Sequence, residues 1–132
     1  MTNQDRGRDT ALLLARALLS ALFILSGIEK LFSYQATAAF MQAHSVPNWF
    51  LPIVIFIEAI GGAAILIGFK TRLFAILLAI FSVSAAVVFH NQLDNKIHFI
   101  LFWSDLAIAG GFLALVASGP GRFSVDQRIK RR

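Results

Sequence analysis

The stretch ALLLARALLSALFILSGIEKLF, residues 11–32, is almost entirely apolar, yet it contains Arg16 and closes on Glu29 and Lys30. At about 1.5 Å of rise per residue, a helix of this length crosses the ~30 Å hydrocarbon core of a bilayer. The stretch therefore predicts a membrane-spanning helix. It also raises the question of what its charged side chains meet, because ionised groups inside a membrane are costly unless they face protein or water.

Three further stretches have the length and composition of membrane spans. The chain has 132 residues, of which 58% are hydrophobic and 14% charged, which is unusual for a soluble domain of this size. A soluble helical bundle would need polar outer faces repeating every ~3.6 residues, and none occur. We therefore expect an all-α integral membrane four-helix bundle, formed by residues 1–132 as a single domain. Its predicted helices cover about residues 10–32, 51–68, 72–89 and 97–117, followed by a basic tail over residues 119–132.

A cleaved signal peptide is an alternative interpretation of the first span. Arg6 and Arg8 precede the apolar stretch, and ATA at residues 36–38 resembles a cleavage site. The stretch is long for a signal peptide, however, and Glu29 and Lys30 interrupt it. A retained first helix is the more consistent interpretation.

The distribution of Lys and Arg predicts that both termini are cytoplasmic. Basic residues close to helix ends favour the cytoplasmic side of a membrane. In this chain they gather before the first span, in the turn between the second and third spans, and in the tail: Arg6, Arg8, Lys70, Arg72, Arg122, Arg128, Lys130, Arg131 and Arg132. The loops 33–50 and 90–97 contain only Lys96 and are expected to face outward, on the far side of a bacterial cytoplasmic membrane. In the loop 33–50, a short interfacial helix is expected before Pro47.

Helical spacing places the rare polar residues on defined faces of the four spans. At 100° per residue, one narrow stripe of the first span contains Arg16, Ser20, Phe23, Gly27 and Lys30. Glu29 points away from Lys30 at this spacing. Comparable faces of the other spans are formed by Glu58, Gly61, Gly62 and Ile65; by Ala75, Ala79, Ser82, Val83, Ala86 and His90; and by His98, Leu101, Asp105, Ala109 and Phe112.

These faces predict a polar pocket in the outer half of the bundle, to which all four helices contribute. Its candidate residues are Arg16, Glu29, Lys30, Glu58, Ser82, His90, His98 and Asp105, with Arg16 lying apart in the cytoplasmic half and Lys70 and Arg72 charging the cytoplasmic face. Intramembrane ionisable residues mark functional sites more often than not. A purely structural network that fixes helix register is the alternative, because polar contacts between membrane helices contribute about 0.6–2 kcal/mol each.

The order of several motifs resembles the DoxX family of small bacterial membrane proteins. ARALLSALFILSGIEKLF (15–32) is similar to the family's first helix, AAFMQAHSVP (38–47) to its outer loop and IEAIGGAAILIGFKTR (57–72) to its second helix and turn. VVFHNQ (87–92) and SGPGRFSVD (118–126) are similar to the end of its third helix and to its closing motif. The resemblance implies a four-helix membrane bundle. The family's polar positions match Arg16, Lys30, Glu58, Arg72 and His90, with Asp105 a less specific match.

The resemblance also implies functions linked to redox chemistry. Family members have been associated with thiosulfate:quinone oxidoreduction, with quinol oxidase complexes, and with an assembly that joins superoxide dismutase to a sulfurtransferase. For this chain it favours a quinone-associated membrane subunit, with quinone as the candidate cofactor. A donor set of His90, Lys30 and Ser82 would bind the ring carbonyls, and Glu58 and Asp105 would relay protons.

Two other functions stay open from the sequence. One is a non-enzymatic scaffold whose basic tail recruits a soluble redox enzyme. The expected partners are the lipid bilayer, a protein of a redox complex and a second copy of this chain in a homo-oligomer. The other is transport of a proton or small solute, although four helices leave little room for a path.

Several chemistries are disfavoured by composition. The chain has no cysteine, which excludes disulfides and thiolate chemistry within it. No nucleic-acid recognition module accompanies the net charge of +5. No metal site is expected, because His90, His98 and the carboxylates lack the spacing of a ligand motif.

Overall fold

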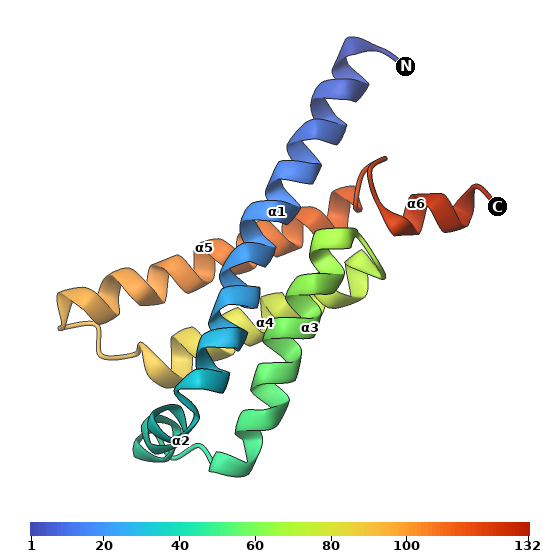
Figure 1. Cartoon of the computed structure of the whole chain (residues 1–132). Helices are drawn as coiled ribbons and strands as arrows, with labels where there is room; N and C mark the ends of the chain where they lie inside the picture. The colour runs from blue at the N-terminus through green and yellow to red at the C-terminus, as the bar shows by residue number, and fades with distance from the viewer.

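The computed structural model describes residues 1–132 and is all-helical, with four helices long and apolar enough to span a membrane. The spans are α1 (Asn3–Phe32), α3 (Leu51–Ile67, extended at its start by the 3-10 turn η1, Asn48–Phe50), α4 (Thr71–Phe89) and α5 (Lys96–Ser118). A short helix α2 (Tyr34–Ala43) lies between α1 and η1, and α6 (Val125–Lys130) ends the chain. The predicted fold class is confirmed, including the short helical segment before Pro47. Both termini lie at the same end of the molecule (Figure 1).

Local signals explain where the helices begin and end. α1 starts about seven residues earlier than its apolar stretch because Thr2 and Asp5 form a reciprocal capping box. α5 begins after Asn95, whose side chain accepts from the backbone N–H groups of Ile97 and His98. α3 ends at Gly68, which adopts the left-handed conformation with φ +74°.

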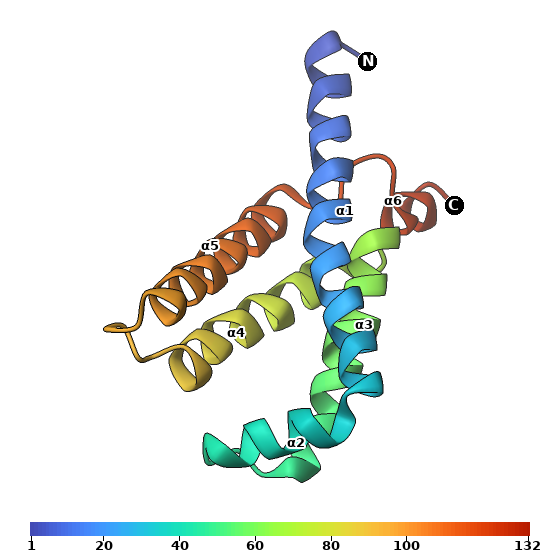
Figure 2. The same cartoon turned by 60° about the vertical axis from the view of Figure 1, so that its left-hand side comes forward.

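The four spans associate as two helix pairs. α1 packs along α3, and α4 packs along α5, whereas α1 and α5 meet over a much shorter length. Figures 1 and 2 both show the two pairs close together near α6 and diverging toward α2. Phe23 of α1 lies where they meet, with its ring 5.4 Å from that of Phe112 and 6.2 Å from that of Phe81.

The core is small and the apolar surface is large. One cluster of buried side chains surrounds Phe23, and a second joins α2 to α3 through Met41 and Leu51. Leu18 is 75% exposed and Ile80 is 60% exposed, with many similar residues on every span. Such a surface belongs in hydrocarbon rather than in water, in agreement with the predicted membrane spans.

Candidate functional site

The first polar pair joins α1 to α3. Lys30 Nζ lies 2.9 Å from Glu58 Oε2 and 3.2 Å from Glu58 Oε1. Ser26 completes the network: its Oγ accepts from Lys30 Nζ at 2.6 Å and donates to Glu58 Oε1 at 3.2 Å. Glu58 is only 4% exposed, so its carboxylate depends on these two partners for compensation of its charge.

Two glycines allow α1 and α3 to approach closely enough for this pair to form. A Cβ added to Gly27 would lie 2.9 Å from the backbone nitrogen of Ala59, and one added to Gly62 would lie 3.1 Å from that of Ile24. Backbones in such contact gain dispersion energy without a hydrophobic driving force, as is usual between membrane helices. Gly27 and Gly62 therefore position Lys30 opposite Glu58.

The second polar pair joins α4 to α5. His90, which directly follows α4, has its Nδ1 2.9 Å from Asp105 Oδ2. The His98 ring lies beside it, with ring centroids 5.8 Å apart. His98 Nδ1 is buried and has no hydrogen-bond partner. An unsatisfied buried polar atom costs about 1–3 kcal/mol, and this nitrogen is the one buried side-chain atom of His90, His98 and Asp105 that the protein leaves without a partner.

The structure brings the predicted outer residues together as two pairs rather than as one cluster. No hydrogen bond or ion pair connects Lys30 and Glu58 to His90, His98 and Asp105. The reason is the divergence of the helix pairs beyond Phe23 (Figure 2). Helix phases show which face of each span is buried, but they do not show which neighbour that face meets.

Arg16 has a different role from the one expected of a pocket residue. It is 1% exposed, and its guanidinium donates to three backbone carbonyls: Nη1 to Pro120 at 2.7 Å, and Nη2 to Phe123 at 2.7 Å and Leu66 at 3.1 Å. These contacts connect α1 to the end of α3 and to the segment before α6. Arg16 therefore fastens the closing segment of the chain, far from the outer polar pairs.

Asp126, which is not among the residues predicted from the sequence, holds the same segment against the start of α4. Its Oδ1 accepts from the backbone N–H of Lys70 at 2.8 Å and its Oδ2 from that of Thr71 at 2.9 Å, where α4 begins. Its own N–H donates to the Gly68 carbonyl at 2.9 Å. Partial burial raises the pKa of Asp126, but the hydrogen bonds from Thr71 and Lys70 outweigh it and leave this pKa below its ordinary value.

Gly68 and Ser124 explain why these contacts are possible. A Cβ at Gly68 would lie 2.4 Å from the Ser124 Cβ and 2.8 Å from Arg16 Nη1. Two features of the sequence indicate these contacts. Gly68 is typical of a helix C-terminus, and Ser124 with Asp126 two residues later is typical of a capped helix start. The tail is therefore partly a folded element of the bundle.

The remaining predicted residues lie outside both polar pairs. Glu29 is exposed, and its carboxylate accepts from Ser33 Oγ at 2.8 Å. Ser82 is buried but donates to the Leu78 carbonyl at 2.9 Å within its own helix, so its proton is already used. Lys70 and Arg72 are exposed at the α3–α4 turn.

The surface has two notable hollows, and neither is lined by the polar pairs. One of about 480 Å³ lies on α5, lined by Phe99, Ile100, Trp103, Ser104 and Ala107. At 100° per residue, this face is opposite that of His98 and Asp105. The other lies beside α6. No group of three or more His, Asp or Glu side chains lies close enough together to hold a metal ion.

Comparison with known proteins identifies the family. The DoxX family pattern matches residues 11–91, which include both members of the Lys30–Glu58 pair and His90. The chain belongs to the DoxX family. It is 40% identical to inner membrane protein YqjF of Escherichia coli over 94% of this chain and 95% of that protein. It is 34% identical to inner membrane protein YphA of the same organism, over 92% of this chain and 91% of YphA.

A more distant relative has a name that refers to chemistry. The protein named "Putative oxidoreductase CatD" of Bacillus subtilis is 27% identical over 78% of this chain and 82% of its own length. No solved structure matches the chain. Together with the four spans, these relationships make this DoxX protein a multi-pass membrane protein.

Proposed function

We propose that this DoxX protein is a redox-linked subunit of a bacterial inner membrane, and that His90, His98 and Asp105 bind the head group of a quinone. The observation that carries the proposal is the buried His98 Nδ1 without a partner, next to a histidine already oriented by a carboxylate. The redox assignment is also supported by the oxidoreductase name of the relative CatD. The absence of cysteine means that electrons must pass through a bound carrier rather than through a thiol of this chain.

The chemistry of the two histidines suits a ligand with carbonyl oxygens. The contact between His90 Nδ1 and Asp105 fixes the orientation of that ring and leaves Nε2 free for a hydrogen bond with a ligand. The His90 side chain is 21% exposed, so a ligand can reach it from outside the α4–α5 pair. His98 Nδ1 supplies a second polar atom, and the ring spacing of 5.8 Å allows both histidines to contact one small head group.

A bound quinone would supply a carrier for two electrons and two protons. A proton that leaves Nε2 of His90 for the ligand can be replaced at Nδ1 when the Asp105 carboxyl group carries a proton, and the exposed end of the pair can take up the next proton from water, so the pair can act as a short proton relay. The network of Lys30, Ser26 and Glu58 lies on the other helix pair. We assign it to the stability of the α1–α3 contact rather than to the ligand.

The test is quinone binding by the purified full chain in detergent or nanodiscs. Quinone is extracted from the preparation, and binding of a short-chain quinone is titrated for the wild type and for His98→Ala, His90→Ala and Asp105→Asn. His44→Ala is the matched control, because His44 lies on α2 and contacts the Phe40 carbonyl instead. Binding that is lost in the first three variants and kept in the control supports the proposal. Absence of binding, or equal binding by all variants, refutes it.

A second candidate is a membrane partner that holds a soluble redox enzyme at the cytoplasmic face. It is favoured by the folded state of the basic tail, which Arg16 and Asp126 hold in place rather than leaving it as a free chain. Crosslinking in intact membranes, followed by mass spectrometry, would reveal a protein partner or a second copy of this chain. This candidate is independent of the histidine site.

A further inference from the structure

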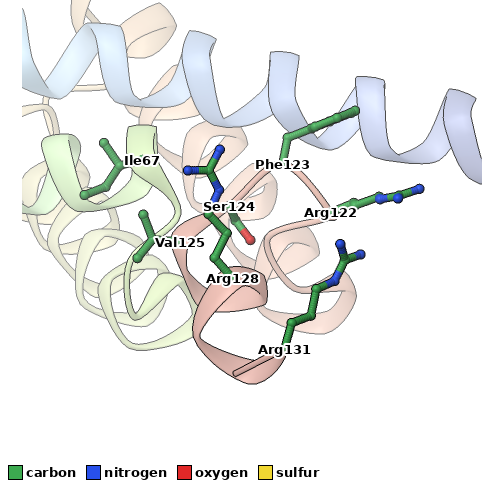
Figure 3. Close-up of a pocket in the computed structure, with 7 residues that line it drawn as sticks. All are labelled: Ile67, Arg122, Phe123, Ser124, Val125, Arg128 and Arg131. Carbon is green, nitrogen blue, oxygen red and sulfur yellow. The ribbon is translucent and has the colours of Figure 1, made fainter.

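A hollow of about 410 Å³ lies between the end of α3 and the closing segment of the chain. Its lining, drawn in Figure 3, consists of Ile67, Arg122, Phe123, Ser124, Val125, Arg128 and Arg131. This volume lies within the ~300–1,000 Å³ range of small-molecule sites. The hollow is distinct from the histidine site, which lies at the other end of the helices.

No carboxylate forms an ion pair with the arginines of the hollow. Arg122, Arg128 and Arg131 take part in no ion pair; the only ion pairs of the chain are Lys30–Glu58 and His90–Asp105. The neighbouring carboxylates point at backbone N–H groups rather than at these guanidinium groups: Asp126 accepts from the start of α4, and Asp9 accepts from the backbone N–H of Arg122 at 3.0 Å. The Arg122 guanidinium itself contacts only the Met1 sulfur. Figure 3 shows Arg131 extending toward Arg122. Three guanidinium groups around one hollow are suited to a phosphate, which they can bind through charge-assisted, bidentate hydrogen bonds.

The hollow also has an apolar wall at the membrane end. Ile67 is the last residue of the spanning helix α3 and is 53% exposed, and Phe123 is 52% exposed. Val125 continues this wall at the start of α6. A soluble anion gains nothing from such surface, whereas a lipid places acyl chains and glycerol next to its phosphate.

The segment that carries the arginines is held in place before any ligand binds. Arg16 donates to the Phe123 carbonyl, and the Asp126 N–H donates to the Gly68 carbonyl. Ser124 is buried between them, and its Oγ donates to the Gly121 carbonyl at 2.8 Å. A site that is already ordered loses less conformational entropy on binding.

We propose that this hollow is a binding site for the phosphodiester head group of an anionic phospholipid, in the leaflet where both termini lie. The phosphate binds Arg122, Arg128 and Arg131, and the start of the acyl chains lies along Ile67 and Phe123. The site differs from general attraction of a basic tail to a charged surface, because it depends on which arginines are present and not only on their number.

The chain offers a matched pair of variants that separates these two cases. Arg128→Gln with Arg131→Gln removes two charges from the hollow, and Lys130→Gln with Arg132→Gln removes two charges from the same tail without touching the lining. Both double variants keep Arg16 and Asp126, so the closing segment stays docked. Circular dichroism and elution volume of the purified chains check that both are folded.

The measurement is native mass spectrometry of the full chain in detergent, titrated with phosphatidylglycerol and, separately, with zwitterionic phosphatidylcholine. We expect the wild type to retain phosphatidylglycerol preferentially. The Arg128/Arg131 variant should bind this lipid at least about tenfold more weakly, because two charge-assisted contacts are lost. The Lys130/Arg132 variant should bind it within about threefold of the wild type.

Three outcomes would overturn the proposal. Equal loss in both double variants would mean that only total charge matters. Displacement of the lipid by millimolar inorganic phosphate, with phosphate itself retained, would identify a soluble phosphate as the occupant. Retention of a protein at this site, with no preference between the two lipids, would identify a docking surface for a partner.

Discussion

Arg16→Ala should release the closing segment of the chain, because this one guanidinium binds the Pro120 and Phe123 carbonyls of the segment and joins them to the Leu66 carbonyl at the end of α3. Hydrogen bonds to a charged donor contribute about 1.5–3 kcal/mol each, so the two bonds to the segment represent a gross contribution of about 3–6 kcal/mol. Two effects reduce this value. The Nε–H of Arg16 is buried without a partner, and the Pro120 and Phe123 carbonyls can bind water when the segment opens. We expect a net loss of about 3 kcal/mol, the lower end of this gross range.

The assay is hydrogen–deuterium exchange of the full chain in nanodiscs, followed at the amides of Arg122 and Asp126. These amides donate to Asp9 and to the Gly68 carbonyl, so they exchange only when the segment opens. A loss of about 3 kcal/mol accelerates exchange by about a hundredfold, at 1.4 kcal/mol per factor of ten.

Two variants provide the controls for this measurement. Arg16→Lys keeps the charge, but a single ammonium lacks the planar fork that reaches all three carbonyls, so exchange should be intermediate. Arg72→Ala removes an exposed arginine that makes no hydrogen bond, and it should change exchange less than threefold. Arg16→Ala exchange within threefold of the wild type, or an equal effect of Arg72→Ala, would refute the role of Arg16 as the fastening residue.

Three further predictions follow from the same contacts. Gly68→Ala should open the segment as well, because its φ of +74° disfavours a side chain and the new Cβ would lie 2.4 Å from the Ser124 Cβ; exchange after residue 124 measures this, and an unchanged rate contradicts it. Lys30→Met should lower the thermal stability in detergent by about 3–5 kcal/mol by leaving Glu58 buried without a cation, and adding Glu58→Gln should restore most of the loss; no recovery in the double variant would argue against the pair. Because the pKa of Asp126 is lowered in the folded chain, its carboxylate stabilises the docked segment fully above the ordinary pKa of 3.8, and this stabilisation is lost as the pH falls through the lowered pKa. Exchange should therefore accelerate below about pH 3.8, and this acceleration should disappear in Asp126→Asn.

The buried face of each span was predictable from the sequence. In α1 the buried residues are Arg16, Ser20, Phe23 and Gly27, four of the five residues placed on one stripe by helical spacing, and the fifth, Lys30, is half-buried. Glu58 is likewise buried with Gly61, Gly62 and Ile65 in α3. These predictions succeed because helix geometry within a span depends only on local backbone structure. Val83 and Leu101, each 41% exposed, are the exceptions on the other two stripes.

The partners of the buried polar groups were harder to predict. Arg16 binds backbone carbonyls, and every residue has a carbonyl, so no residue type marks the acceptor. The arrangement of the polar residues as two pairs depends on how far the helix pairs diverge, which is set by side chains such as Phe23 between them. The contact of Asp126 is hidden by the positive charge of the tail, which favours the interpretation of residues 119–132 as a basic segment. Asp126 is nevertheless the single acidic residue of this segment, which indicates a specific contact.

The two ends of the molecule differ in a way that links the proposals to the fold. At the end near α6, Arg16 and Asp126 connect α1, α3, α4 and the closing segment through hydrogen bonds to backbone groups. At the other end the helix pairs diverge (Figure 2). There α2 connects them through the stacked rings of Phe40 and Phe89, whose centroids are 5.4 Å apart. The His44 ring also packs against Phe89, with centroids 5.3 Å apart. Hydrogen bonds to a buried charge resist opening more strongly than such ring contacts do, so we expect movement between the pairs to be easier at the α2 end. His90 directly follows Phe89 in the chain, so the proposed ligand site lies at the end of the molecule where we expect this easier movement, which would help to admit a ligand.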